Sequence, residues 1–283
     1  MNLITVKKFL ITFLLFLETA ILFFMVYYSQ VFAQSSGNCL KDNIGARVDG
    51  LVSTPNLVSD LKTKTGECII DNAAISPLQE ARITKIKSYA DLKSIFYDQA
   101  KTTSFVEKHP PLVGNKTHSD LDLGALGGKD HLYLIQGDLS ITGNISGSST
   151  GIIFVDGNLT IGDPTLPSYK LQYGNDASGL VFVVGKDIRI DKLVSQIDGV
   201  MISSGTICTA WDNGVCPQGD VLVNEALVIY GSLISLDESK PIKFKRTLTI
   251  NTDASEIIKT QFKYLVILKN SFSQDLLIST EIN

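Results

Sequence analysis

One short phrase is written five times between His131 and Leu236. Each copy is a largely apolar run that ends in glycine, at Gly137, Gly157, Gly185, Gly205 and Gly231. Subtraction of the residue numbers puts these glycines 20, 28, 20 and 26 residues apart. A phrase that recurs at such a period is typical of a stack of similar coils. The feature predicts a mainly β fold, a single-stranded parallel β-solenoid in which a right-handed coil is favoured.

Alternation of side chains along a strand divides each copy between two faces. In a stack, equivalent residues of successive coils lie over one another, so each face predicts one ladder. The predicted core ladder contains Tyr133, Ile153, Val181, Met201 and Leu227. The opposite positions are apolar as well, which indicates that another element covers the outer wall. This predicted outer ladder contains Leu134, Phe154, Phe182, Ile202 and Val228.

The glycine of each copy predicts a turn with positive φ, which glycine adopts without a Cβ penalty. After it a second strand begins, apolar at Leu139, Leu159, Ile207 and Leu233. In the third copy the apolar residue, Ile188, comes one place late, so a β-bulge is expected there. An ordinary β-sandwich is the rival architecture, because its strands also recur with turn signals between them.

The segment from Ser88 to Lys101 predicts a helix. Ser88 and Asp91 form a capping-box-like start, and Tyr89, Leu92, Ile95, Phe96 and Gln99 follow helical spacing. This stripe is suited to cover the outer ladder. Near the C-terminus, Asp253 and Glu256 resemble another capping box, which predicts a short helix from Ala254 and a strand from Phe262 to Leu268.

These elements divide the chain into five regions. They are a signal peptide or membrane anchor (1–33), an N-terminal cap (34–87), a helix with a long connection (88–130), the β-solenoid (131–250) and a C-terminal cap (251–283).

The N-terminus predicts export. Lys7 and Lys8 precede an apolar run over residues 9–28, which is long enough to span a bilayer with the lysines on the cytoplasmic side. The residues up to Ala33 resemble a signal-peptidase site, and retention as an anchor is slightly favoured over cleavage. The expected location is therefore extracytoplasmic, either anchored to the membrane or secreted at the cell surface.

The four cysteines fit an oxidising compartment. Locality pairs Cys208 with Cys216 across a turn-rich loop, and Cys39 with Cys68. A zinc site is the competing interpretation, but the sequence has no Cys-x-x-Cys and its three histidines lie far from both pairs. No metal and no cofactor are therefore expected.

No catalytic set emerges from the sequence. Asp138, Asp156, Asp187 and Asp198 recur near the turns, where aspartate is favoured for local hydrogen bonding. The motifs of pectin hydrolases, P-loops and dinucleotide folds are absent. A net charge of −4 gives no reason to expect a nucleic-acid partner. The one dense basic cluster, 240–246, is most simply a charged exposed face, and an anionic-glycan or phosphate patch is the sharper alternative.

The recurring Gly-Asp/Asn-Leu-Thr/Ser-Ile phrase, the Gly-Thr-Ile-Cys-Thr loop at Gly205 and the late Lys-Tyr-Leu-Val-Ile-Leu segment resemble exported β-solenoid domains of bacterial surface and pilus-associated proteins. The ladders also resemble those of bactofilins, which form cytoplasmic polymers. The first resemblance implies a non-catalytic structural or adhesive surface protein. Its expected partners are envelope glycan or pilus and surface proteins, in addition to the membrane that residues 9–28 would contact. The alternative is a lyase or hydrolase that acts on polysaccharides.

Overall fold

The computed structural model describes residues 44–49, 51–53, 68–71, 88–124, 126–143, 145, 149–166, 168–173, 178–237, 239–249, 254–264 and 266–267. The chain divides into two compact units, Met1–Cys39 and Leu40–Asn283, and every described residue belongs to the second.

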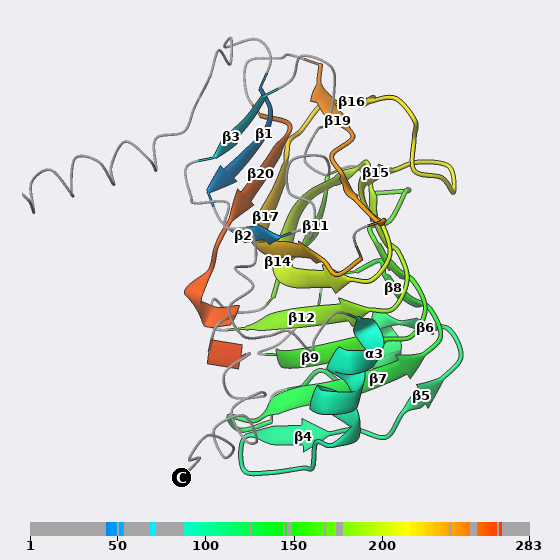
Figure 1. The fold of residues 1–283 in the computed structure, drawn as a ribbon, viewed down its shortest axis with the longest axis vertical. Helices are drawn as coiled ribbons and strands as arrows, with labels where there is room; N and C mark the ends of the chain where they lie inside the picture. Colours follow the sequence, from blue (N-terminus) through cyan, green and yellow to red (C-terminus); the bar gives the residue numbers. More distant parts are fainter. Residues whose placement is uncertain are drawn as a thin grey trace, which may run out of the picture. The chain divides into compact units, whose positions relative to one another are not determined.

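Parallel strands dominate the fold, as the repeats predict. A twelve-stranded sheet has the order β3-β1-β20-β17-β14-β12-β9-β7-β4, and β11, β2 and β5 pair with β14, β17 and β7 (Figure 1). Its strands are β1 (Ile44–Asp49), β2 (Leu51–Ser53), β3 (Cys68–Asp71), β4 (Val106–Lys108), β5 (Leu112–Val113), β7 (Asp130–Gln136), β9 (Thr150–Val155), β11 (Tyr169–Leu171), β12 (Gly179–Val184), β14 (Val194–Ser203), β17 (Leu227–Ser235) and β20 (Glu256–Lys259).

A second sheet, of six strands, has the order β18-β15-β13-β10-β8-β6. Its strands are β6 (Lys116–Thr117), β8 (Leu139–Ile141), β10 (Leu159–Ile161), β13 (Ile188–Asp191), β15 (Ile207–Trp211) and β18 (Ile242–Lys243). A two-stranded parallel sheet joins β16 (Val221–Val223) to β19 (Arg246–Leu248), and a 3-10 turn, η2, covers His118–Asp120.

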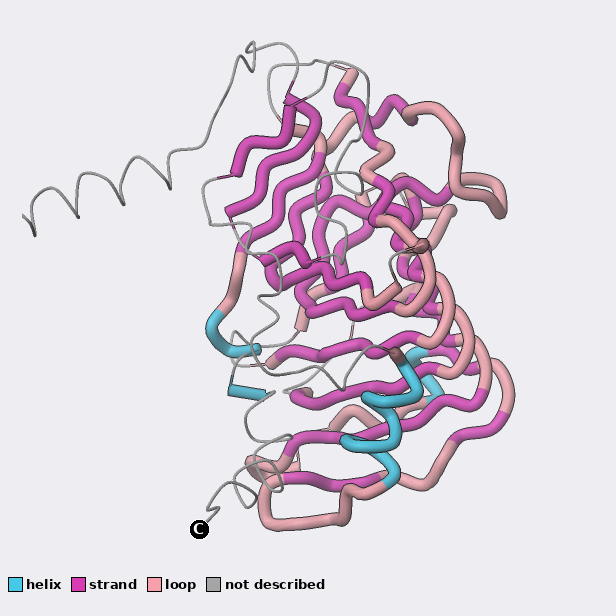
Figure 2. Tube along the Cα trace, viewed as in Figure 1, coloured by secondary structure: helices cyan, strands magenta, loops and turns pink. Residues whose placement is uncertain are grey.

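The chain alternates between the two large sheets. It runs from β7 to β8, from β9 to β10, from β12 to β13, from β14 to β15 and from β17 to β18, and we call each such pair a coil. Figure 2 shows the connecting loops beside one another. Every pairing between named strands is parallel, which excludes an antiparallel sandwich for the described residues and is compatible with a β-solenoid.

The register corrects the predicted core ladder. Tyr133 lies opposite Ile153 as expected, but Ile153 lies opposite Phe182, Phe182 opposite Met201, and Met201 opposite Leu233. The prediction for Val181 was wrong, and Leu227 lies in the inner core but opposite Glu256, outside this ladder, because the copies were aligned on glycine. The apolar residue of the second strand sets the register, since Leu139, Leu159, Ile188 and Ile207 pair in succession without a bulge at Ile188.

The same shift corrects the outer ladder. The observed outer residues are Leu134, Phe154, Val183, Ile202 and Ile234, which lie opposite one another in that order. Phe182 belongs to the inner cluster, and Val228 lies opposite Gln196 and Ile257 at the other end of β17. Val181 belongs to the outer cluster.

The turn glycines allow the backbones of neighbouring coils to pack closely; the left-handed turns predicted for them are not formed. None of the five has φ in the left-handed region. A Cβ on Gly137 would lie 2.5 Å from the carbonyl oxygen of Gly114, and one on Gly157 would lie 2.6 Å from that of Gly137. Gly231 lies inside β17 opposite Gly199, so it marks no turn. The glycines are therefore required where successive backbones touch.

The predicted helix exists but changes type halfway. Helix α3 covers Tyr89–Lys93 and starts at Ser88, whose hydroxyl accepts the backbone N–H of Asp91, and a π-helix, η1, continues over Ser94–Asp98. The wider turn puts Tyr97, five residues after Leu92, on the buried face, while Gln99 is exposed. Leu92, Phe96 and Tyr97 pack on the outer ladder, so the helix covers that wall.

At the C-terminal end the predicted helix and strand are exchanged. Residues 256–259 form β20, and residues 262–264 and 266–267 are helical. The β-branched Ile257 and Ile258 favour a strand, and the capping residue Asp253 lies outside the described residues. In the helical segment, Tyr264 and Ile267 are three residues apart and both pack on the outer cluster.

Other predictions fall outside the described residues. These are the apolar run 9–28, the signal or anchor segment 1–33, most of the cap region 34–87, and Cys39. Cys68 begins β3, but its side chain is not described. Among the described helices, none has the length and apolarity needed to cross a bilayer.

Candidate functional site

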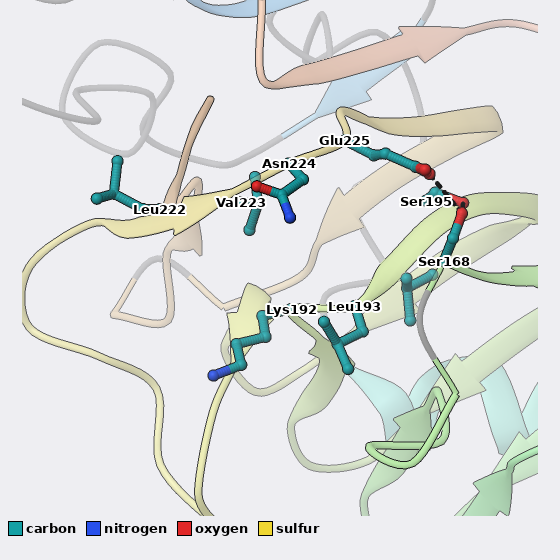
Figure 3. Close-up of a pocket in the computed structure, with 9 residues that line it drawn as sticks. Ser168, Lys192, Leu193, Ser195, Leu222, Val223, Asn224 and Glu225 are labelled. Carbon is teal, nitrogen blue, oxygen red and sulfur yellow. Dashed lines mark hydrogen bonds between the residues drawn. The ribbon is translucent and has the colours of Figure 1, made fainter. Parts of the chain in front are cut away.

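A surface cavity of about 190 Å³ lies where two connections meet the twelve-stranded sheet (Figure 3). One wall is the turn from β13 into β14, and the facing wall is β16 with the residues after it. The serine that precedes β11 closes one end. The lining residues are Ser168, Lys192, Leu193, Val194, Ser195, Leu222, Val223, Asn224 and Glu225.

A chain of hydroxyl groups ends on the carboxylate of the cavity. The Ser168 hydroxyl donates to Glu225 Oε2 and lies 3.1 Å from the Ser195 hydroxyl. Because Ser168 has a single proton and gives it to Glu225, Ser195 donates its own to Ser168 or to the carbonyl of Tyr169, 3.3 Å away. Ser168 has φ 58°, a left-handed conformation that is uncommon for serine.

The other polar groups are an amide and an ammonium. Asn224 Oδ1 accepts a hydrogen bond from Thr249, and in Figure 3 its amide nitrogen points toward Lys192 and Leu193. Lys192 Nζ lies 3.0 Å from Asp212 Oδ1 at the rim. Leu193, Val223 and Leu222 add apolar surface, and Leu222 is 70% exposed. A few polar groups around apolar side chains suit a ligand rich in hydroxyl groups.

The predicted Cys208–Cys216 disulfide is present and borders this site. Its sulfur atoms are 2.06 Å apart and its Cα atoms 6.0 Å apart. Between them, Asn213 and Gly214 have positive φ, and Asp212 pairs with Val215, which is the geometry of a tight hairpin. Asp212 of this hairpin holds Lys192, so the disulfide positions one rim of the cavity.

The turn aspartates do not converge on a site. Asn158 donates both its backbone and side-chain N–H groups to Asp138 Oδ1, at 2.8 and 3.1 Å, and Thr206 donates its backbone N–H to Asp187 Oδ1 at 2.9 Å. These bonds join neighbouring coils, whereas local bonds were expected; only Asp198, which accepts the side-chain N–H of Gln196 at 3.3 Å, makes a local bond among these four. Asp156 instead accepts the Tyr89 hydroxyl and the Lys93 ammonium, and so fixes α3. Burial, and then this hydrogen bond, raise the pKa of Tyr89.

The basic cluster 240–246 contains a buried arginine that the sequence did not reveal. Ile242 and Phe244 point inward as expected, but Arg246 is 1% exposed. Its guanidinium donates to the carbonyls of Thr209, Val194 and Asp191 at 2.7, 2.5 and 2.7 Å. Burial lowers the pKa of Arg246 to about 10 and raises that of the neighbouring Glu256.

His109, His131 and Tyr133 form a second cluster that was not predicted from the sequence. The His109 ring stacks on that of Tyr133, with ring centroids 3.9 Å apart. His109 Nε2 lies 3.0 Å from His131 Nδ1, and His131 Nε2 lies 2.8 Å from the carbonyl oxygen of Gly124. A carbonyl only accepts, so His131 carries its proton on Nε2 and receives the Nε2 proton of His109. Burial lowers the pKa of both histidines and raises that of Tyr133 to about 12.

None of the cavity residues was singled out from the sequence, because they come from connections that carry no periodicity. Among the described residues, no group of three or more His, Cys, Asp or Glu side chains is placed to hold a metal ion.

The fold and site define a mainly β protein of parallel sheets with a polar cavity beside a disulfide hairpin. Comparison with protein families, with curated proteins and with solved structures found no match.

Proposed function

We propose that this chain is an extracytoplasmic, non-catalytic surface protein that folds as a right-handed parallel β-solenoid and binds an envelope glycan in the cavity around Ser168 and Glu225. The observation that carries the proposal is the lining of this cavity. Hydroxyl, amide, carboxylate and ammonium groups surround it, and leucine and valine side chains complete its walls. Such groups complement the hydroxyls and the apolar C–H surface of a sugar.

Binding suits this lining better than hydrolysis. Glycosidases use two carboxyl groups, about 5 to 10 Å apart. Among the described residues that line the cavity, Glu225 is the only carboxylate, and it accepts a hydrogen bond from Ser168. An enzyme would need to bring the turn aspartates together, but Asp138 and Asp187 are bonded from coil to coil, Asp156 is bonded to α3, and Asp198 accepts a hydrogen bond from Gln196 on its own strand.

Export is supported by the apolar run at 9–28 after two lysines and by the Cys208–Cys216 disulfide, because disulfides persist mainly in oxidising compartments. An anchored N-terminus would leave the stacked coils and their cavity outside the cytoplasm. A rigid stack is a suitable support for display, since each coil needs only its neighbours for stability.

The test is a glycan-array measurement on the full-length chain in detergent, beside the variants Asn224→Ala and Glu225→Gln. We expect selective binding that both variants weaken, because each removes a polar group of the cavity. Lys170→Gln, an exposed change on β11, serves as the control and should bind normally. Absence of selective binding, or binding that ignores both cavity variants, would contradict the proposal. Shortening of any bound glycan would show an enzyme instead.

A further inference from the structure

The outer face of the six-stranded sheet carries a straight row of polar side chains. Ser140 lies opposite Thr160, and Thr160 opposite Arg189. Their neighbours on each strand, such as Leu139 and Ile141, are buried, so the row itself faces outward. Neither hydroxyl makes a hydrogen bond to the part of the chain that the structure describes. These groups are therefore available to a ligand that lies along the sheet.

The Arg189 guanidinium is oriented by a neighbouring ring but makes no close ion pair. It lies over the ring of Trp211, 4.7 Å from the centroid, which orients the planar group. Its Nε is buried and makes no hydrogen bond, whereas Nη2 comes only to 4.0 Å from Asp187 Oδ2. The other oxygen of Asp187 already accepts the backbone N–H of Thr206. The partly exposed terminal Nη groups of this oriented guanidinium are therefore the donors left for a ligand, and they match a carboxylate in both shape and charge.

A second cation lies on the same face. Arg189 pairs with Cys208, which pairs with Lys243, so the arginine and the lysine are about two strand spacings, roughly 10 Å, apart. The Lys243 ammonium has no hydrogen bond or ion pair within the described residues. The chain as a whole has a net charge of −4, so this face differs in sign from the average of the molecule.

The row and the cavity are linked through Lys192. Lys192 of the cavity follows Arg189 by three residues, and its backbone N–H donates to the carbonyl oxygen of Trp211 at 3.1 Å. Its ammonium pairs with Asp212, the residue after Trp211. Trp211 and Arg189 are therefore the neighbours of the Lys192 rim to which a ligand longer than the cavity can extend.

We infer that the bound glycan is acidic, and that Arg189 binds a uronate carboxylate of the chain that leaves the cavity. This inference rests on the proposed function and names the ligand class of the same site. Trp211 acts as a positioning residue that holds the guanidinium flat, and Lys243 supplies a second positive charge along the same face.

The test compares two ligands that differ only in charge. One is a hexasaccharide with glucuronate at alternate positions, and the other is its methyl ester. Affinity for the full-length chain is measured by calorimetry with wild type, Arg189→Gln and Arg189→Lys, and Lys170→Gln is the matched control for loss of one exposed positive charge. Melting temperatures check that each variant is folded.

We expect wild type to prefer the acid, and Arg189→Gln to weaken binding of the acid by about tenfold or more while binding of the ester is unchanged. Arg189→Lys should bind the acid more tightly than Arg189→Gln but less tightly than wild type, because lysine keeps the positive charge but lacks the planar guanidinium that can donate two hydrogen bonds to one carboxylate. Lys170→Gln should have no effect. Equal binding of acid and ester by wild type, or an acid affinity insensitive to Arg189, would overturn the inference while leaving the cavity proposal intact. Failure of both ligands to bind would overturn the inference. The glycan array with Asn224→Ala would then test the proposed function separately.

Discussion

Arg246 and Glu256 are neighbours in the core, yet the arginine guanidinium turns away from the carboxylate. Glu256 Oε1 accepts the backbone N–H of Arg246 at 3.1 Å and the Thr209 hydroxyl at 2.6 Å. The guanidinium instead donates to three backbone carbonyls, two of them on either side of the turn from β13 into β14. The two charges therefore join the end of β13, the start of β14, β15, β19 and β20.

Replacement of Glu256 by Gln should destabilise the protein strongly. It leaves the Arg246 charge buried without its counter-charge and puts an amide where a carboxylate accepts several hydrogen bonds. Breaking a buried pair in this way costs about 3 to 5 kcal/mol. Urea unfolding measures the change, and Glu225→Gln, at the exposed Ser168 bond, is the control expected to leave stability nearly unchanged. Equal unfolding midpoints for the two variants would contradict the role of Glu256.

Acidification should loosen the stack of His109, His131 and Tyr133. The folded pKa of both histidines is lowered by burial, despite the opposing effect of Glu107 and Asp122, so the unfolded chain binds protons first. Stability contributed by these groups is complete above the unfolded pKa of about 6.5 and is lost as pH falls from there through the folded pKa. A proton on His131 Nδ1 also removes the acceptor that His109 uses.

The variant His131→Gln tests this pH dependence. Its amide can still donate to Gly124 but does not titrate, so the decline in unfolding free energy below pH 6.5 should be shallower, by up to about 1.4 kcal/mol per pH unit for one proton. Melting curves across pH 4 to 8 measure this difference. Parallel pH profiles for wild type and variant would show that His131 does not contribute.

Gly157→Ala should destabilise the stack, because the new Cβ would meet the backbone of Gly137 in the neighbouring coil. Overpacking of this kind typically costs about 1 to 3 kcal/mol. Gly219→Ala is the matched control, since a Cβ there meets nothing within 4 Å. Chemical denaturation of both variants compares the two sites, and an unchanged Gly157→Ala midpoint would show that the coils do not touch there.

Loss of the Cys208–Cys216 disulfide should cost about 2 to 3 kcal/mol on the chain-entropy estimate for so short a loop. The variant Cys208→Ser/Cys216→Ser is compared with wild type in guanidinium, without reductant. The same variant should also bind the glycan more weakly, because Asp212 would no longer hold Lys192 at the cavity rim. Unfolding curves that coincide with wild type would contradict a stabilising disulfide.

The parts of the fold that the sequence predicted are those with a periodic or local signal. The repeated apolar runs predicted parallel strands, the Ser88 start and apolar stripe predicted the covering helix, and the short spacing of Cys208 and Cys216 predicted their disulfide. Pairing register lacks such a local signal. Alignment on Gly185 shifted Val181 and Phe182 by one residue, and a one-residue shift moves every side chain of a strand to the opposite face.

Polar contacts between residues far apart in the chain also could not be predicted from the sequence. Arg246 looks like part of an exposed basic run until β13, β14 and β15 place three carbonyls around it. The cavity has the same origin, because Ser168, Lys192 and Glu225 come from three separate connections. Neither arrangement follows from spacing, because it depends on which strands become neighbours.

The stacking of coils in register is the central structural claim, and a cysteine pair on the outer face of the six-stranded sheet tests it most directly. Ser140 and Thr160 lie directly opposite each other on adjacent parallel strands, so Ser140→Cys/Thr160→Cys should form a disulfide on mild oxidation. Peptide mapping by mass spectrometry separates this bond from those of the native cysteines. The account predicts a 140–160 crosslink and none in Ser140→Cys/Arg189→Cys, whose positions are two strands, about 10 Å, apart. A failure of 140 and 160 to crosslink while 140 and 189 do so would contradict the stacked register.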